Sequence, residues 1–319
     1  MIRARSTGTP LYVRTGAYRP YWATYGAGDA VRAPAVSGAD TDGLPIFAEP
    51  LMLTGLELQY VGAKSLRLLP GVWSAGVPYC KFGFTSFSSL PYMNIQPDSV
   101  GLNGLDKDYR GAGSAPFFTD GWYYAYLLGK SSDTWNNTRV VLSQGISVTT
   151  VRGNLNANVP GSSAYNFIRK MAFAVYYDSA LGTGGDFRLY NMRGGYPLPG
   201  YEYIGADCTS NWQIASVVNA TGSPIVDQSV SCATWVPDNG RFCDLVMEMT
   251  TQGGSGTAKL RTPGVPGEGD FLSIESTATV PVRLRTTMIT LSNRTLLASV
   301  PNGTTLNIYA RGFGIRELV

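Results

Sequence analysis

The chain has 319 residues, of which 44% are hydrophobic and 15% charged, and its net charge is +3. This apolar content is enough for ordinary folded domains, and the balanced charge gives no indication of nucleic acid as a partner. Histidine is absent from the sequence, which excludes Ser-His-Asp and Cys-His triads and histidine-ligated zinc. With 38 Gly, 19 Pro and 19 Tyr, the composition favours short strands joined by turns, so the predicted fold class is all-β.

Residues 1–48 form the first predicted segment, an extended N-terminal arm without a persistent helical or strand period. Its arginines and large rings are the residues expected to dock the arm onto another surface. They are Arg3, Arg5, Tyr12, Arg14, Tyr18, Arg19, Tyr21 and Trp22. Burial of each ring on a partner contributes about 1.5–3 kcal/mol, whereas a solvated tail would leave the rings in water. An arm folded back on its own chain is the alternative.

Residues 49–200 are predicted to form a β-rich domain that begins with a hairpin. In LELQYVGAKSLRLLPG, residues 56–71, apolar and polar side chains alternate on both sides of a Gly-Ala-Lys turn. GWYYAYLLGK carries apolar bulk on both faces and is expected in the centre of a sheet. FIRKMAFAVYYD is compatible with a helix, but Val175, Tyr176 and Tyr177 favour a strand. The other strand candidates are CKFGFTSF, TRVVLSQGISVTTVRG and DFRLYNMRGG.

Residues 201–319 are predicted to form a second, C-terminal β-domain. Its strand candidates are WQIASVVNAT, FCDLVMEMTTQ, TAKLRT, FLSIESTATV, VRLRTTMITLS and TLNIYARGFGIREL. They start roughly 10–15 residues apart with turn residues between them, which is typical of a β-sandwich or jelly roll.

Carboxylates are the remaining candidates for hydrolytic chemistry in a chain without histidine. The candidates are Asp106 with Asp108, Glu202, Glu248, and Glu268 with Asp270. They lie in or beside Gly-rich turns, where acids serve solvation and turn geometry. The glycine clusters LGTGGD and QGGSGTAK lack the spacing of a phosphate-binding loop. We therefore assign no catalytic or metal-binding residue, expect no cofactor, and expect that the chain is not an enzyme.

Three aromatic residues on predicted turns are candidates to face a ligand: Trp135, Tyr201 and Tyr203. A ring beside polar loop residues is a common way to bind a sugar face. The alternative is that these rings close the ends of a β-core.

The cysteines Cys80, Cys208, Cys232 and Cys243 are widely spaced, without a CxxC pair. Buried free thiols are one interpretation. A bridge between Cys232 and Cys243 across a Pro-Asp-Asn-Gly turn is the other, so the pairing stays open. No run approaches about 18 consecutive apolar residues, and membrane insertion is not expected.

The order of segments resembles a module of tail-fibre and related appendage proteins of tailed bacteriophages. The resemblance rests on LELQYVGAKSLRLLPG, then GWYYAYLLGK, then NFIRKMAFAVYYDS with DFRLYNMRGG. WQIASVVNATGSP, CATWVPDNGRFCDLVMEM, GGSGTAKLRTPG and TLNIYARGFGIREL are similar to β-sandwich ends of the same class, so the resemblance covers about residues 50–319.

The resemblance implies a virion component, assembled in the host cytoplasm as a homotrimer. It implies attachment to other virion proteins at the N-terminus and a distal β-domain that faces a host-surface glycan or protein. One alternative is a decoration or connector protein of the capsid, neck or tail with no receptor role. A second is a glycan depolymerase acting through carboxylates, although the repeated coils of a β-helix are not found in the sequence.

Overall fold

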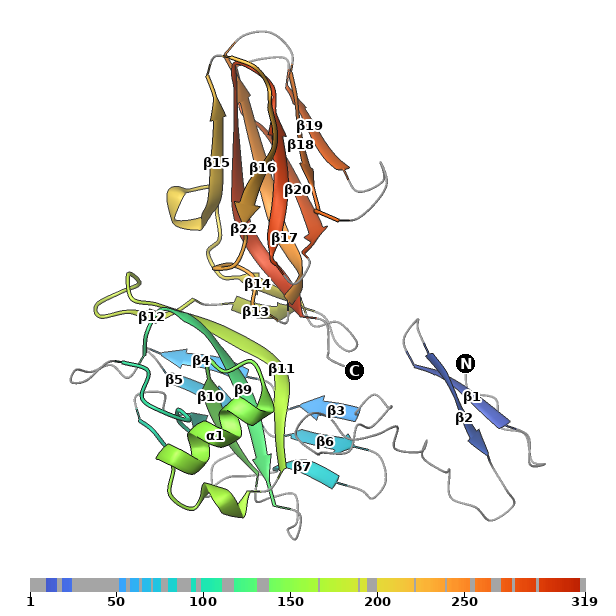
Figure 1. The fold of residues 1–319 in the computed structure, drawn as a ribbon, viewed down its shortest axis with the longest axis vertical. Helices are drawn as coiled ribbons and strands as arrows, with labels where there is room; N and C mark the ends of the chain where they lie inside the picture. Colours follow the sequence, from blue (N-terminus) through green and yellow to red (C-terminus); the bar gives the residue numbers. More distant parts are fainter. Residues whose placement is uncertain are drawn as a thin grey trace. The chain divides into compact units, whose positions relative to one another are not determined.

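In the computed structural model, the described residues lie mostly in strands, with one α-helix and short 3-10 turns among them (Figure 1). The described residues are 10–15, 19–24, 52–55, 58–62, 65–69, 71–75, 80–84, 93–95, 99–110, 118–130, 138–165, 167–188, 190–193, 200–220, 222–238, 240–252, 256–264, 271–276, 279–290 and 293–315. The chain divides into two compact units, one of Met1–Thr119 and Tyr123–Phe173 with Val319, the other of Asp120–Trp122 and Ala174–Leu318. The predicted all-β fold class is confirmed.

A β-hairpin lies within the N-terminal segment. Strands β1 (Pro10–Thr15) and β2 (Arg19–Thr24) pair antiparallel as a two-stranded sheet, with Tyr12 opposite Trp22. The expectation of an extended N-terminal arm stays a prediction, although Tyr, Val, Trp and Thr in these two strands favour extended backbone. Arg3, Arg5 and Tyr18 lie outside the described residues, and the docking role of the arm stays a prediction.

Two three-stranded antiparallel sheets follow in the first unit. Their orders are β4-β5-β8 and β3-β6-β7. The bounds are β3 (Met52–Gly55), β4 (Leu58–Gly62), β5 (Ser65–Leu68), β6 (Gly71–Ala75), β7 (Cys80–Phe84) and β8 (Met93–Ile95). The predicted hairpin is confirmed, since Leu58 lies opposite Leu68 and Tyr60 opposite Leu66. Leu66 and Leu68 are buried while Ser65 is exposed, as the alternation predicts.

A four-stranded sheet has the order β10-β9-β11-β12. The bounds are β9 (Gly121–Gly129), β10 (Arg139–Ser143), β11 (Phe167–Asp178) and β12 (Asp186–Phe187). Strand β9 lies between two neighbours and is buried from Trp122 to Gly129, so its predicted central position is confirmed. The strand assignment of FIRKMAFAVYYD is confirmed by β11.

Helix α1 (Val148–Asn158) replaces the second half of a predicted strand. The prediction that TRVVLSQGISVTTVRG is extended throughout is correct for β10 and wrong from Val148 onward. Ser147 caps the helix because its hydroxyl accepts a hydrogen bond from the Thr150 amide at 3.1 Å. Val151 and Leu155, one turn apart, are the buried side chains of the helix. No helix among the described residues has the length and apolar character needed to cross a membrane.

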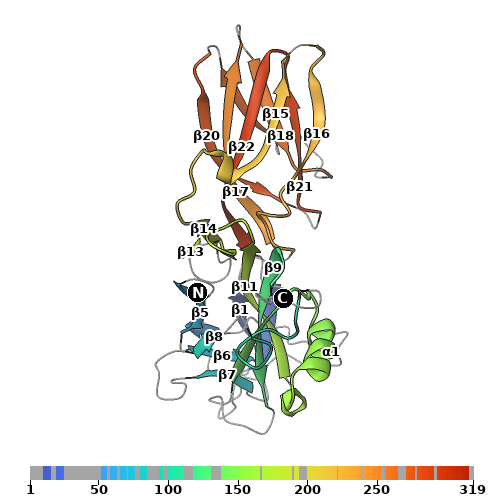
Figure 2. The ribbon, with the colours of Figure 1, turned by 90° about the vertical axis from the view of Figure 1, so that its left-hand side faces the viewer.

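The second unit contains a two-sheet β-sandwich, whose layers are visible in Figure 2. One sheet has the order β13-β14-β22-β17-β20, with β15 also paired to β22, and the other has the order β16-β21-β18-β19. The first comprises β13 (Tyr190–Arg193), β14 (Gly200–Tyr203), β15 (Gln213–Asn219), β17 (Gly240–Thr251), β20 (Val282–Ile289) and β22 (Thr304–Ile315). The second comprises β16 (Ile225–Ser231), β18 (Gly256–Arg261), β19 (Phe271–Ser276) and β21 (Thr295–Val300).

The core of the sandwich follows from alternation along these strands. Leu245, Met247 and Met249 of β17 are buried, as are Leu260 of β18 and Leu296 of β21. Since successive side chains of a strand point to opposite faces, the alternate residues of β17, Asp244, Val246 and Glu248, lie on the outer face of the first sheet.

Candidate functional site

The outer face of the first sandwich sheet gathers carboxylates and arginines, which we call the polar face. Its charged members are Glu202 of β14, Asp244 and Glu248 of β17, Arg283 and Arg285 of β20, and Arg311 of β22. Strand register brings them together, because Glu248 lies opposite Arg283 on one side and Asn307 on the other. Cross-strand neighbours on one face are close enough for their side chains to interact.

Glu248 is the most enclosed acid of the polar face, at 8% exposed. Its carboxylate accepts hydrogen bonds from Arg283 Nε at 2.6 Å, the Tyr309 hydroxyl at 3.2 Å and Asn307 Nδ2 at 3.4 Å. Burial acts to raise the pKa of Glu248, but these hydrogen bonds outweigh it and hold the pKa below the ordinary value. Burial, together with the charge of Glu248, raises the pKa of Tyr309. Glu248 is thus held as an anion.

Arg285 and Arg311 hold the other two carboxylates. Arg285 Nη2 lies 2.7 Å from Asp244 Oδ2 and 3.3 Å from Glu202 Oε1. Arg311 Nη2 lies 3.4 Å from the same Glu202 oxygen, and Arg311 Nη1 donates to the carbonyl of Ala206. The hydrogen bond to Asp244 raises the pKa of Arg285. Each described carboxylate of the polar face is therefore paired with at least one guanidinium group.

This pairing bears directly on the predicted carboxylate chemistry. A general acid must hold a proton near the working pH, which needs a raised pKa, whereas arginine neighbours favour the ionised carboxylate. Glu202 and Glu248 are brought to one face, but as ion-paired acceptors. The side chains of Arg283 and Arg285, 59% and 44% exposed, face solvent. Glu268 and Asp270 lie outside the described residues.

Asp106, another candidate acid, is completely buried in the first unit. It accepts hydrogen bonds from the Tyr109 hydroxyl at 2.6 Å, Ser143 Oγ at 2.7 Å and Asn154 Nδ2 at 2.7 Å. Burial raises its pKa, although the three donors act in the opposite direction. With no exposed surface, Asp106 joins α1 to β10 and offers nothing to a substrate. Asp108 forms a separate pair with Arg110 at 3.0 Å.

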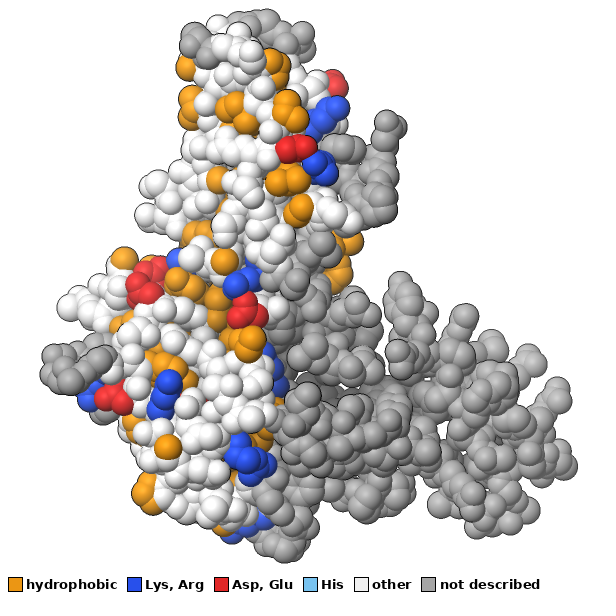
Figure 3. All heavy atoms as spheres, in the orientation of Figure 1, with side chains coloured by type: hydrophobic (Ala, Val, Ile, Leu, Met, Phe, Trp, Pro, Cys, Tyr) orange, Lys and Arg blue, Asp and Glu red, His pale blue; other side chains and the backbone are white. Residues whose placement is uncertain are grey.

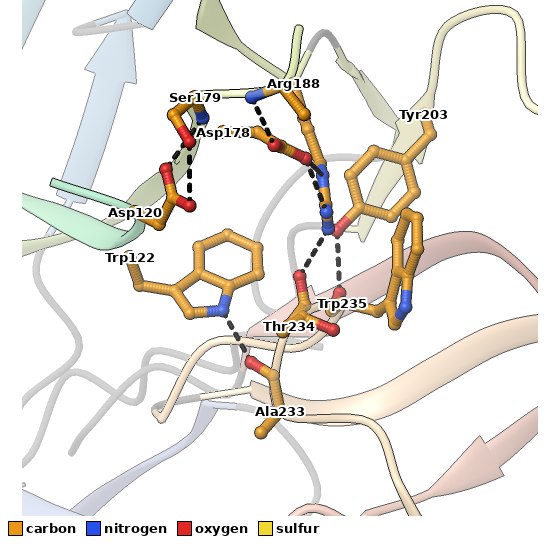
Figure 4. A network of polar contacts seen from close by, with 10 residues as sticks. Asp120, Trp122, Asp178, Ser179, Arg188, Tyr203, Ala233, Thr234 and Trp235 are labelled. Atoms are coloured by element: carbon orange, nitrogen blue, oxygen red, sulfur yellow. Dashed lines mark hydrogen bonds and ion pairs between the residues drawn. The ribbon is translucent and has the colours of Figure 1, made fainter. Parts of the chain in front are cut away.

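A polar network in the second unit surrounds Arg188 and the turn at residues 232–238 (Figure 4). Arg188 Nη2 lies 2.8 Å from Asp178 Oδ2, and Arg188 Nη1 donates to the Thr234 carbonyl at 2.6 Å. The guanidinium group lies over the rings of Tyr176 and Trp235, at 4.2 and 4.0 Å from their centroids. An arginine that is ion-paired and stacked between two rings is held in one conformation, and Arg188 thereby links β11 to the turn at residues 232–238.

Two of the predicted ligand-facing aromatics, Tyr201 and Tyr203, are buried among other rings of the second unit. Tyr201 and Tyr203 are each 3% exposed, which corrects the expectation that they face a ligand. Tyr201 stacks on Phe313 with centroids 4.8 Å apart, and the Tyr203 hydroxyl donates to the Trp235 carbonyl at 2.7 Å. The alternative, rings that close the end of a β-core, describes both. Trp135 lies outside the described residues.

The thiols of Cys208, Cys232 and Cys243 are free, so the bridge considered between Cys232 and Cys243 is not formed. Cys232 and Cys243 are both buried, and a hydrogen bond between them, with burial, raises the pKa of Cys243. The side chain of Cys80, in β7, is outside the described part of the chain, and its pairing stays open. Within the described ranges, no cluster of three or more Cys, Asp or Glu side chains could hold a metal ion.

No protein-family model matches the chain, and no curated protein matches its sequence. Among solved structures, it is similar to a carbohydrate-binding module of Cellvibrio mixtus lichenase 5A in complex with cellotriose, at 14% identity and TM-score 0.18, over 45% of this chain and 88% of that one. An exo-β-1,3-galactanase from Phanerochaete chrysosporium is similar at 10% identity and TM-score 0.19, over 81% of this chain and 56% of that one. A Bombyx mori GH32 β-fructofuranosidase is similar at 9% identity and TM-score 0.18, over 95% of this chain and 75% of that one.

Proposed function

We propose that the chain is a virion protein of a tailed bacteriophage, a tail fibre or receptor-binding appendage. It attaches through residues 1–48 to other virion proteins and presents its β-domains to the host surface as part of a homotrimer. The phage assignment rests on the resemblance of residues 50–319 to appendage modules. One observation supports binding over catalysis: each described carboxylate of the polar face is ion-paired with arginine.

The physical argument concerns what a paired carboxylate can do. Glu248, whose lowered pKa keeps it ionised, is a poor proton donor. Breaking the arginine pairs of Glu202, Asp244 and Glu248 to reach a substrate would be unfavourable. The same pairs fix the side chains of neighbouring strands in one arrangement. A surface whose side chains are held in place loses little conformational entropy on binding, which suits a recognition protein.

The experiment is binding of fluorescently labelled full-length protein to susceptible cells. Intact phage serves as competitor, and resistant mutant cells serve as the control. Saturable binding that slows phage adsorption, and is absent on resistant cells, is the expected result. A folded, correctly assembled protein that binds neither cell type would rule out the receptor role.

A decoration or connector protein is the second candidate, and the β1–β2 hairpin supports it as much as it supports the appendage. Its described strands pair only with each other, and an isolated two-stranded hairpin is marginally stable in water. Docking on another virion protein would stabilise it. Both candidates require residues 1–48 for incorporation into particles, whereas only the receptor-binding candidate predicts that the purified protein binds cells.

The proposal also holds that the chain does not cleave a host glycan. Replacement of Asp106, Asp108, Glu202 and Glu268 by their amides tests this directly. A decrease in the viscosity of host polysaccharide that is caused by the wild-type protein and abolished in a folded variant of Asp108, Glu202 or Glu268 would instead support a depolymerase.

A further inference from the structure

Cys232 and Cys243 form a pair of thiols in the interior of the second unit. Each side chain is completely buried, and a hydrogen bond joins the two thiols. Hydrophobic side chains, cysteine among them, are orange in Figure 3 and reach the face shown there in scattered groups, but neither thiol of this pair contributes to the surface. We call Cys232 and Cys243 the thiol pair.

The thiol pair spans the two layers of the sandwich. Cys243 lies in β17, which is hydrogen-bonded to β20 on one side and to β22 on the other. Cys232 directly follows β16 of the second sheet, and its amide donates to the Arg294 carbonyl at 2.7 Å. A covalent bond between the two sulfur atoms would therefore join the sheets and close a loop of residues 232–243.

The two cysteines differ in how far their backbone can move. A disulfide holds its sulfur atoms about 2.05 Å apart, closer than a hydrogen bond does, so the thiol pair must approach further before the bond forms. Cys243 is held in a ladder on both sides, whereas Cys232 lies beyond the last ladder pair of β16, Ser231 with Thr295. The turn at residues 232–238 is therefore the part that supplies the movement.

Polar contacts hold this turn in place and limit access to the thiol pair. Three side chains donate to its consecutive backbone carbonyls at 2.8, 2.6 and 2.7 Å (Figure 4): Trp122 to Ala233, Arg188 to Thr234, and Tyr203 to Trp235. Arg294 also forms an ion pair with Asp238 at 2.6 Å. A reagent reaches Cys232 only when the turn opens and these contacts break.

We propose that the thiol pair is a site of oxidative modification, which a low-molecular-weight disulfide such as oxidised glutathione converts into a disulfide bridge between the two sheets. The Cys232 thiolate attacks the reagent, so that one reagent sulfur stays on Cys232 and the other leaves as a thiolate. The Cys243 thiolate then attacks the Cys232 sulfur and displaces the second reagent thiolate. The two cysteine protons pass to the released thiols, so the protein is oxidised and one reagent disulfide is reduced to two thiols.

The timing of this reaction rests on the proposed function. A virion protein is made in the host cytoplasm, where glutathione keeps thiols reduced. The bridge therefore forms after release of the particle, outside the reducing cytoplasm. There it stabilises the sandwich, because a cross-link restricts the unfolded chain.

The test oxidises reduced full-length protein with excess oxidised glutathione, counts thiols in denaturant and maps the linked peptides. Trypsin cleaves after Arg241 and so separates Cys232 from Cys243. Mapping uses Cys208→Ala, because Cys208 shares a tryptic peptide with Cys232. The expected results are loss of two of the four thiols of the wild type, a link between the peptides of the thiol pair, and a melting temperature about 5–10 °C above that of the reduced protein. Cys232→Ala should form no internal bridge.

The role of the turn is tested by the rate of oxidation. Arg188→Ala removes one of its contacts and should react about tenfold faster, as expected for loss of a hydrogen bond from a charged group. Arg261→Ala is the matched control, since it removes the ion pair of the sandwich with Asp227, and its rate should equal that of the wild type. Circular dichroism confirms that both variants fold.

Four intact thiols after prolonged oxidation, or a link to Cys80 in place of the bridge, would overturn the modification site. Equal rates for Arg188→Ala and wild type would overturn the role of the turn. Rapid alkylation of infected cells and of released particles tests the timing, with the thiol pair reduced in cells and bridged in particles. A bridge already formed in cells, or thiols still reduced in particles, would overturn it. Absence of the protein from particles would instead overturn the proposed function and leave the bridge in the purified protein unaffected.

Discussion

At the scale of single residues, Glu248 shows how the sandwich uses a charge. Because its folded-state pKa is lowered, its ionised form contributes stability above the unfolded pKa of about 4.3, and that contribution is lost as pH falls through the folded pKa. We expect Glu248→Gln to lower the free energy of unfolding by about 1–2 kcal/mol at neutral pH. The difference from wild type should shrink in acid.

Urea unfolding at a series of pH values measures this difference. Glu275→Gln is the matched control, since Glu275 is exposed and accepts a long hydrogen bond of 3.5 Å from Thr257 Oγ1, and its effect should stay within about 0.5 kcal/mol. An effect of Glu248→Gln that is equal at neutral and acidic pH would contradict a role for the charge.

Asn154 provides a second residue-scale prediction, in the first unit. Its side-chain amide donates to the buried Asp106 at 2.7 Å, so Asn154→Ala leaves a buried carboxylate with one donor fewer. The expected loss is about 1–3 kcal/mol. Asn156→Ala is the control, because Asn156 is exposed on the same helix and both changes carry the same gain in helix propensity. Thermal unfolding should separate the two variants, and equal melting temperatures would show that the hydrogen bond to Asp106 contributes nothing.

At the scale of elements, strands such as β4, β5 and β9 were predictable from local signals, whereas β16 and β21 were not predicted. The hairpin of β4 and β5 follows from alternation alone, and β9 from apolar bulk on both faces. Strand β16 escaped prediction because IVDQSVS is largely polar, and four of its residues are exposed at an edge of the second sheet. Helix α1 was misassigned because Val and Thr favour strands, whereas the Ser147 cap and the contacts of Val151 and Leu155 select the helix.

The candidate sites show a similar limit. Tyr201 and Tyr203 stand beside turn residues in the sequence, yet long-range contacts with Phe313 and Trp235 bury them. Local composition carries no information about such contacts.

Strand β22 yields the element-scale prediction, at its pairing with β14. Gly312 of β22 lies against Tyr201, and a Cβ at this position would overlap the Tyr201 carbonyl oxygen. Since backbone cannot move aside as a flexible side chain can, Gly312→Ala should destabilise the sandwich by about 1–3 kcal/mol or more. The matched change Gly153→Ala, in α1 with open space around it, should stabilise by about 0.5–1 kcal/mol. Comparable unfolding midpoints for both variants would mean that β14 does not pack closely on β22.

At the scale of the whole molecule, the β-domains and the N-terminal segment are expected to have separable roles. The described strands β1 and β2 form hydrogen-bonded pairs only with each other, whereas the remaining described strands belong to five other sheets. No main-chain ladder of those sheets is therefore lost when residues 1–48 are removed. The sandwich in particular keeps both of its sheets and its buried core.

A protein lacking residues 1–48 should therefore fold, bind susceptible cells as the full chain does, and fail to enter particles. Circular dichroism, labelled-protein binding and complementation of a phage that lacks this protein measure the three properties. The full-length chain with Tyr21→Ala and Trp22→Ala is the milder companion variant, because it keeps the length of the segment and removes two of its rings. Incorporation of the truncated protein at the wild-type level would show that attachment lies elsewhere in the chain. Loss of cell binding on truncation, with folding intact, would place receptor contacts in residues 1–48 and contradict the separation of roles.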